Sequence, residues 1–135
     1  MTARFLRFQF PALLWAMLIF VSSTLPQGFF ERFGVQYPWA PKVVHVLFFF
    51  FLCLFLNRAF QGLPASSFLA RRSLPMSVLL CLLFGTLDEV HQMFVASRHP
   101  RVTDVLLDVS GAILMAAALW LWDRFQSVRR EQVIS

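Results

Sequence analysis

The sequence predicts an all-α membrane protein, a compact bundle of four transmembrane helices formed by one domain over residues 1–135. Three observations predict this fold. The chain is 59% hydrophobic and only 14% charged, which is far from the composition of a soluble domain. Its apolar residues form continuous runs and do not alternate as they would in strands. Four of these runs approach the length of about 20 residues that crosses a bilayer as a helix.

The first apolar run covers about residues 8–25. It has the basic start and the cleavage-like segment, at residues 21–23, of a signal peptide. The run is long for a signal peptide, however, and Pro26 stands where cleavage is disfavoured. We therefore expect an uncleaved span.

The other three runs cover about residues 43–60, 75–94 and 105–122. Their connections are short, which favours antiparallel neighbours in a single bundle. Cys53 and Cys81 each lie inside an apolar run. We expect both to be small buried thiols and not a disulfide.

The basic residues beside the runs predict the orientation, because cytoplasmic loops carry an excess of Lys and Arg. One side would carry Arg4, Arg7, Arg58, Arg71, Arg72, Arg124, Arg129 and Arg130, and the other side Arg32, Lys42, Arg98 and Arg101. We therefore expect a multi-pass protein of the bacterial cytoplasmic (inner) membrane with both termini in the cytoplasm. The net charge of +5 is spread over the ends of the runs, so it does not indicate nucleic-acid binding.

Acidic residues interrupt the third run near its predicted outer end. Glu89 and Gln92 share one helical face with Gly85, at spacings of three and four residues, and Asp88 lies one turn before Gln92. Ionisable groups inside a span are costly and usually face a protein interior or a watery cavity. These side chains therefore mark a candidate site.

The fourth run carries a second polar stripe, made of Asp104, Asp108 and Gly111. The glycine would let another helix approach closely. His45 and Ser23 lie at similar depths in the second and first runs. We predict that these groups converge, with Glu89 and Gln92 facing the two aspartates.

This pattern assigns two sets of roles. The catalytic candidates, as general bases or proton carriers, are Glu89, Asp108 and His45. The ligand-binding candidates are Arg98, Gln92, Asp104, Asp88 and Ser23. Structural roles stay open for most of them: helix capping by Thr103 and Asp104, interhelical hydrogen bonds for Asp88, Glu89, Gln92 and Asp108, and backbone hydrogen bonds for Ser22 and Ser23.

Arg98 is the expected counter-ion of the carboxylates, because it lies in the short outer loop after the third run. Arg32, Lys42 and Arg101 could complete an outer cationic rim, which would bind either a specific anion or lipid headgroups. His91 and His99 are assigned to the membrane interface or the loop.

Taken together, these motifs resemble the VanZ-like family of small membrane proteins. The matching residues are Ser22-Ser23 followed by Pro26, then His45, then Glu89-x-x-Gln92, Arg98 and Asp104-x-x-x-Asp108-x-x-Gly111. The family often has Asn where this chain has Asp108, and Pro-Gly where it has Ala96-Ser97. It is named for a protein that lowers susceptibility to the glycopeptide antibiotic teicoplanin. The resemblance implies location and site more than a reaction.

Three functions are compatible with this pattern, and whether the protein is an enzyme stays open. The first is an outer-leaflet site that binds an envelope lipid or amphiphile, with a link to glycopeptide susceptibility. The second is an enzyme acting on a phosphate-bearing lipid, although the chain has no G-x-S-x-G or H-E-x-x-H motif. The third is a proton-coupled lipid transporter acting as an oligomer.

The expected partners are membrane lipids and one amphiphilic or lipid-linked ligand at the outer face. No cofactor or oligomeric state is indicated. The spacing of Glu89, Asp104 and Asp108, which would be the set for a hard divalent cation, is not a recognised metal motif, so no metal ligands are assigned.

Overall fold

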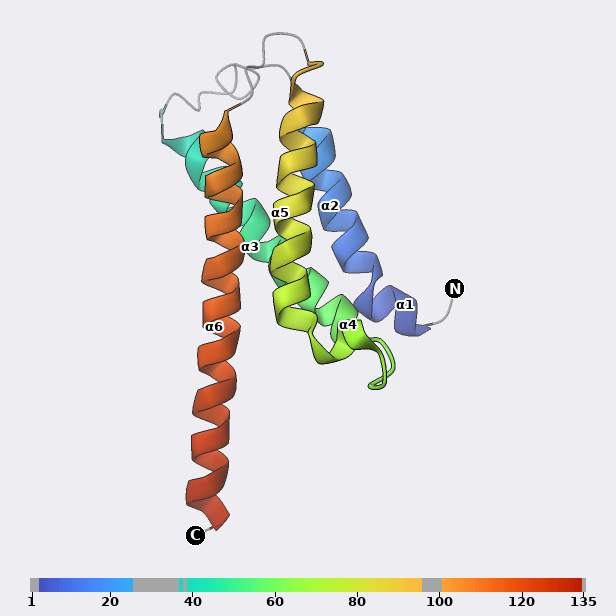
Figure 1. Ribbon diagram of the computed structural model, residues 1–135, viewed down its shortest axis with the longest axis vertical. Coiled ribbons are helices and arrows are strands. Elements are labelled where there is room, and N and C mark those ends of the chain that lie inside the picture. The colour runs from blue at the N-terminus through green and yellow to red at the C-terminus, as the bar shows by residue number, and fades with distance from the viewer. Residues whose placement is uncertain (1–2, 26–36, 38, 96–100, 135) are drawn as a thin grey trace.

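The computed structural model describes residues 3–25, 37, 39–95 and 101–134, and every regular element in these ranges is a helix. In chain order the helices are α1 (Ala3–Phe8), α2 (Phe10–Ser23), α3 (Ala40–Gln61), α4 (Phe68–Arg71), α5 (Ser73–Gln92) and α6 (Val102–Ile134). Helices α3, α5 and α6 are long and apolar enough to cross a membrane, and α2 is a shorter apolar helix. The predicted membrane helical bundle is thus confirmed at this level (Figure 1).

The first predicted span, at about residues 8–25, corresponds to α2, and a separate short helix, α1, precedes it. Helix α1 starts at Ala3, before the predicted start of the span, and α2 begins at Phe10 after a break at Gln9. Pro11 lies in the first turn of α2. Proline suits a helix start but cannot continue a helix, because it lacks the N–H group and its ring clashes with the preceding turn. The break therefore follows from the proline, which hydropathy does not register.

The other three spans fall within a few residues of their predicted bounds, except at the end of α6. Helix α6 continues from the predicted end at residue 122 to Ile134. This last part leaves the bundle and points away from it (Figure 1). An apolar run marks only the part of a helix that lipid can surround, so a polar continuation of the same helix escapes a count of apolar residues.

Helix α3 is the centre of the bundle, since it contacts α1, α2, α4, α5 and α6. The core contains Phe49, Leu52 and Cys53 from α3, packed with Cys81 from α5 and Met115 from α6. Both cysteines are free and fully buried, as predicted.

Helix α2 is tied to α3 through Trp15. The indole Nε1 donates a hydrogen bond of 2.9 Å to the carbonyl oxygen of Phe48. The same ring makes edge contacts with Phe48 and Phe51. This hydrogen bond fixes the position of α2 along α3. The C-terminal end of α2 therefore lies near the polar groups of the candidate site.

Candidate functional site

His45 of α3 and Asp108 of α6 form the contact at the centre of the candidate site. The Nδ1 atom of His45 lies 2.9 Å from Oδ1 of Asp108. The side chain of Asp108 is only 3% exposed, whereas that of His45 is 22% exposed. Where the Asp108 carboxylate is ionised it only accepts, so Nδ1 of His45 is then the donor. Nε2 is an acceptor for another molecule in the neutral imidazole and a donor in the imidazolium.

Two glycines make this contact possible. Gly111 packs so closely on α3 that an added Cβ atom would collide with the carbonyl oxygen of Val46, the residue after His45. Helices α3 and α6 therefore touch backbone to backbone beside the contact. At Gly85 of α5, a Cβ atom would lie 2.9 Å from Oδ2 of Asp108. The carboxylate thus fills the space that a side chain at position 85 would occupy.

Glu89 reaches the same region from α5, where it is 8% exposed. Its Oε1 atom accepts a hydrogen bond from the backbone N–H of Arg101, just before α6 begins. The carboxylate also lies close enough to His45, Asp104 and Asp108 to interact with them electrostatically. Glu89 therefore fastens the start of α6 to α5 and adds a carboxylate next to the His45–Asp108 contact.

Asp88 and Gln92 form a second buried pair one step round α5. Gln92 donates from Nε2 to Oδ2 of Asp88 over 3.1 Å, and both residues are buried. The other oxygen of Asp88, Oδ1, is buried without a hydrogen-bond partner in the described part of the chain. Because an unpartnered buried acceptor is costly, it is a group that a ligand or water would satisfy.

The remaining predicted site residues have more local contacts. Ser23 is buried, and its hydroxyl donates to the carbonyl oxygen of Phe20 over 2.8 Å. Ser22 donates to Ile19 in the same way. Asp104 lies in the first turn of α6 and is partly exposed, where a negative charge complements the helix dipole.

Glu89 and Gln92 of α5 were predicted to face Asp104 and Asp108 of α6, and the contacts agree with this only in part. Asp108 does pack against α5, at Gly85. Glu89, however, bonds to the backbone before α6 and not to either aspartate, and Gln92 bonds within its own helix.

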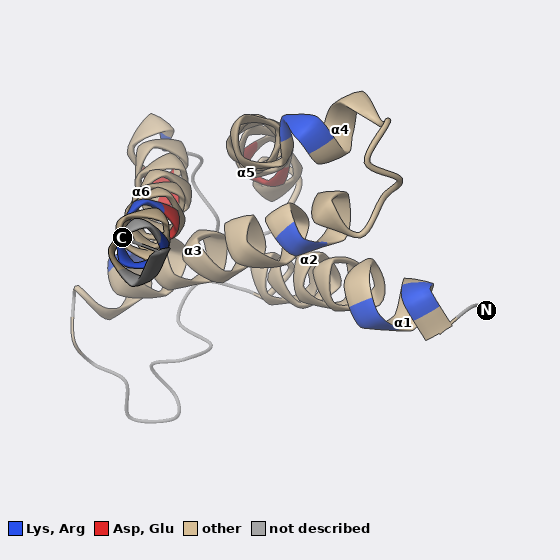
Figure 2. Cartoon of the chain, turned by 90° about the horizontal axis from the view of Figure 1, so that it is seen from below, with Lys and Arg blue, Asp and Glu red and all other residues tan. Residues whose placement is uncertain are grey.

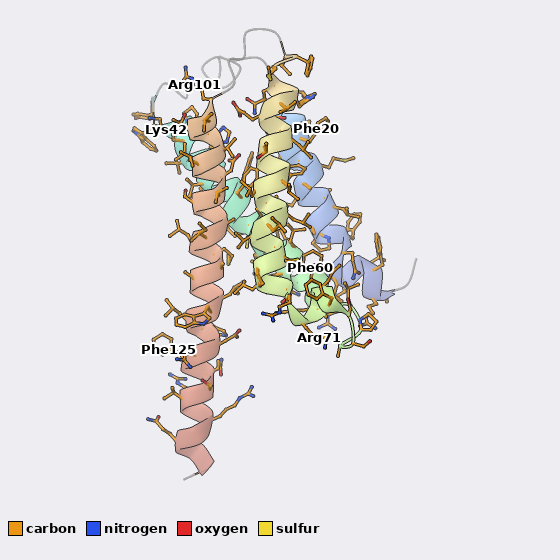
Figure 3. The ribbon with its side chains drawn as sticks, viewed as in Figure 1. Phe20, Lys42, Phe60, Arg71, Arg101 and Phe125 are labelled. Atoms are coloured by element: carbon orange, nitrogen blue, oxygen red, sulfur yellow. The ribbon has the colours of Figure 1, made fainter. Side chains whose placement is uncertain are left out.

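Two basic side chains lie near this region. Lys42 and Arg101 lie at the same end of the bundle as the site, and both are exposed (Figure 3). Arg98, His99 and Arg32 were assigned to this region by sequence, but they lie outside the described residues. The ring of His91, the last-but-one residue of α5, lies 4.6 Å from the ring of Phe20 at a tilt of 36°.

The side chains of this region are arranged for hydrogen bonding and proton exchange and not for metal binding. Among the described residues, no three His, Cys, Asp or Glu side chains are grouped so that they could hold a metal ion. The suggested set of Glu89, Asp104 and Asp108 is therefore not assembled as a metal site. What the arrangement can do is accept hydrogen bonds from a polar head and exchange a proton through His45.

Sequence reasoning missed two features. The first is the backbone N–H of Arg101, which gives no sequence signal because every residue but proline has one. The second is Asn57 of α3, which is 5% exposed with a buried unpartnered Oδ1 atom at the other end of the bundle. Its signal was available, since it is the only asparagine in an apolar run.

Comparison with known proteins identifies the family. The sequence model of the VanZ/LLP1 family matches residues 5–123. This match confirms the resemblance drawn from the motifs and covers every predicted site residue. Searches of curated proteins and of solved structures found no match.

Proposed function

The chain belongs to the VanZ/LLP1 family, and from this premise we propose that it binds the polar head of an envelope lipid or amphiphile at the outer face of the membrane. The observation that carries the proposal is the partly buried contact of His45 with the buried Asp108, next to Glu89 and Asp88, on three different helices. Ionisable groups persist in such surroundings mainly when they serve a function.

The chemistry of the site favours a head group that donates hydrogen bonds. Acceptors in this region include Oδ1 of Asp88, which has no partner in the described part of the chain, and Nε2 of His45 in its neutral form. Hydroxyl and ammonium groups would satisfy both acceptors. The exposed Lys42 and Arg101 at the rim would meet a phosphate that such a head carries.

The proposed orientation has four spans, of which α2 forms the first. Helix α1 and the end of α6 lie away from the site, toward the opposite end of the bundle (Figure 1). That opposite end carries Arg4, Arg7, Arg71, Arg124 and Arg129. It would be cytoplasmic by the excess of basic residues, in a bacterial inner membrane.

The test is native mass spectrometry of the protein purified in mild detergent. Wild-type protein should retain an amphiphile that His45→Gln and Asp108→Asn lose by about tenfold or more, because each removes a charge-assisted hydrogen bond. Asp123→Asn is the matched control, since it changes the same charge on the same helix outside the bundle. Equal retention in all variants, or equal loss in the control, would refute the proposal.

A catalytic function is the second candidate, and one observation favours it. A histidine held at Nδ1 by a carboxylate is oriented to act as a general base through Nε2, and His45 is held in this way. The hydroxyls of Ser22 and Ser23 donate to their own helix, so water would be the nucleophile toward a phosphate-bearing lipid.

Product formation separates the two candidates. Protein in vesicles that contain a polyprenyl phosphate ester would release inorganic phosphate or a shortened lipid if it is an enzyme. His45→Gln would then abolish turnover and leave lipid retention within a few fold. Binding without any product would exclude this hydrolysis. Proton-coupled transport and an effect on glycopeptide susceptibility stay predictions.

A further inference from the structure

We propose that the opposite end of the bundle holds a second site, an inner-leaflet pocket for the phosphate of an anionic membrane lipid. Its inner-leaflet position rests on the orientation proposed above, but its ligand chemistry does not depend on what the outer site binds. The pocket has a volume of about 430 Å³ and is lined by Ala3, Arg4, Arg7, Phe8, Gln61 and Gly62. Two of these residues are cationic and none is acidic.

Arg4 is oriented by the protein itself. Its Nε atom donates a hydrogen bond of 2.7 Å to the carbonyl oxygen of Gly62, at the end of α3. The bond uses only Nε, and within the described residues the two terminal nitrogens of the guanidinium group make no hydrogen bond. A guanidinium held in one orientation loses little freedom when it binds, so it suits a bidentate contact with a phosphate.

Gly62 is required for this geometry. A Cβ atom at position 62 would lie 2.6 Å from Cβ and Cγ of Phe8. The ring of Phe8 therefore packs directly on the chain turn that orients Arg4. Beside it, the guanidinium carbon of Arg7 lies 5.4 Å from the centre of the Phe8 ring, which is within the range of a cation–π contact.

No carboxylate in the described part of the chain pairs with Arg4 or Arg7. Other basic residues gather at the same end: seen from below, Lys and Arg positions occur on α1, α4 and the last part of α6 (Figure 2). Arg71 lies at this end as well (Figure 3). The local potential is therefore positive and attracts anions.

The position of the pocket matches a lipid headgroup. Gly62 follows His45 by 62 − 45 = 17 residues along α3, or about 26 Å at the helical rise. That separation is close to the hydrocarbon thickness of a bilayer, about 30 Å. If the outer site lies at one interface, the pocket lies at the other. Basic pockets between helices on the cytoplasmic side are known to hold anionic headgroups.

The experiment measures lipid adducts by native mass spectrometry after the delipidated protein receives phosphatidylglycerol, phosphatidylcholine or inorganic phosphate. Wild-type protein should bind phosphatidylglycerol in preference to phosphatidylcholine. Arg7→Gln should weaken that binding about fivefold, and Arg4→Gln with Arg7→Gln about 25-fold, at about fivefold per arginine. Arg7→Gln keeps the Arg4–Gly62 hydrogen bond and so guards against misfolding.

The matched control is Arg124→Gln with Arg129→Gln, which removes the same charge from the part of α6 that leaves the bundle. It should leave phosphatidylglycerol binding within twofold of wild type. Equal losses in the control pair would overturn the proposal, because they would show attraction by net charge. Displacement of the lipid by millimolar inorganic phosphate would also overturn it, in favour of a free-anion site.

Discussion

The two ends of the bundle differ in the sign of their ionisable groups and in how deeply these groups are buried. At one end, the side chains of Asp88, Glu89 and Asp108 are buried between helices. At the other end, Arg4 and Arg7 are exposed at the mouth of a pocket.

Burial explains the difference. A buried carboxylate must find hydrogen bonds inside the protein, whereas an arginine has a long apolar stem and can keep its charged end in the headgroup region. Substitutions at the end with the buried carboxylates should therefore lower stability strongly, because those contacts depend on the placement of the helices. Substitutions at the end with the exposed arginines should lower it little. The following substitutions test this contrast, in order of decreasing expected effect.

Gly111→Leu should be the most damaging, with a loss of about 3 kcal/mol or more in the free energy of unfolding. Its side chain would meet the carbonyl of Val46, which belongs to a helix backbone and cannot move aside. Unfolding in mixed detergent micelles measures the loss. Ala117→Leu is the control, because Ala117 is exposed on the same helix; a similar loss there would contradict the assigned close approach.

His45→Ala should cost about 2 to 3 kcal/mol, and Asp108→Ala about 1 kcal/mol less. The first substitution leaves a buried carboxylate without its partner. The second leaves only His45 without a partner, and because its side chain is 22% exposed, water can replace the lost contact. A double-mutant cycle measures the coupling of the two side chains. Additive losses would show that the 2.9 Å contact has no energetic significance.

Asp88→Asn should raise the free energy of unfolding by about 1 kcal/mol while it weakens binding of the amphiphile. The change removes a buried charge and keeps an oxygen that can accept from Gln92. Thermal unfolding and lipid retention are measured on the same preparation. A stability loss without any change in retention would mean that Asp88 is purely structural.

Arg4→Gln should have the smallest effect on stability, about 0.5 kcal/mol, because Arg4 is an exposed residue and its hydrogen bond to Gly62 is only partly buried. The same unfolding measurement checks it. A loss comparable to that of His45→Ala would break the contrast between the two ends and give Arg4 a structural role in joining α1 to α3.

Sequence and structure agree where the signal is local. The all-helical membrane fold, the approximate bounds of α3 and α5 and the burial of Cys53 and Cys81 follow from runs of apolar residues, which can be counted along the chain. The break at Gln9 also had a local cause, Pro11. Hydropathy did not predict that α6 continues to Ile134, because many residues of this last part are polar.

For the site, the sequence by itself determined which ionisable groups enter apolar segments, and at what depth, since both depend only on composition and helical rise. Only the tertiary structure decided which of them meet. Helices of equal hydropathy can rotate and tilt against each other freely until their backbones touch. The close approach at Gly111 and the space at Gly85 select Asp108 for His45, and leave Glu89 to the backbone of Arg101.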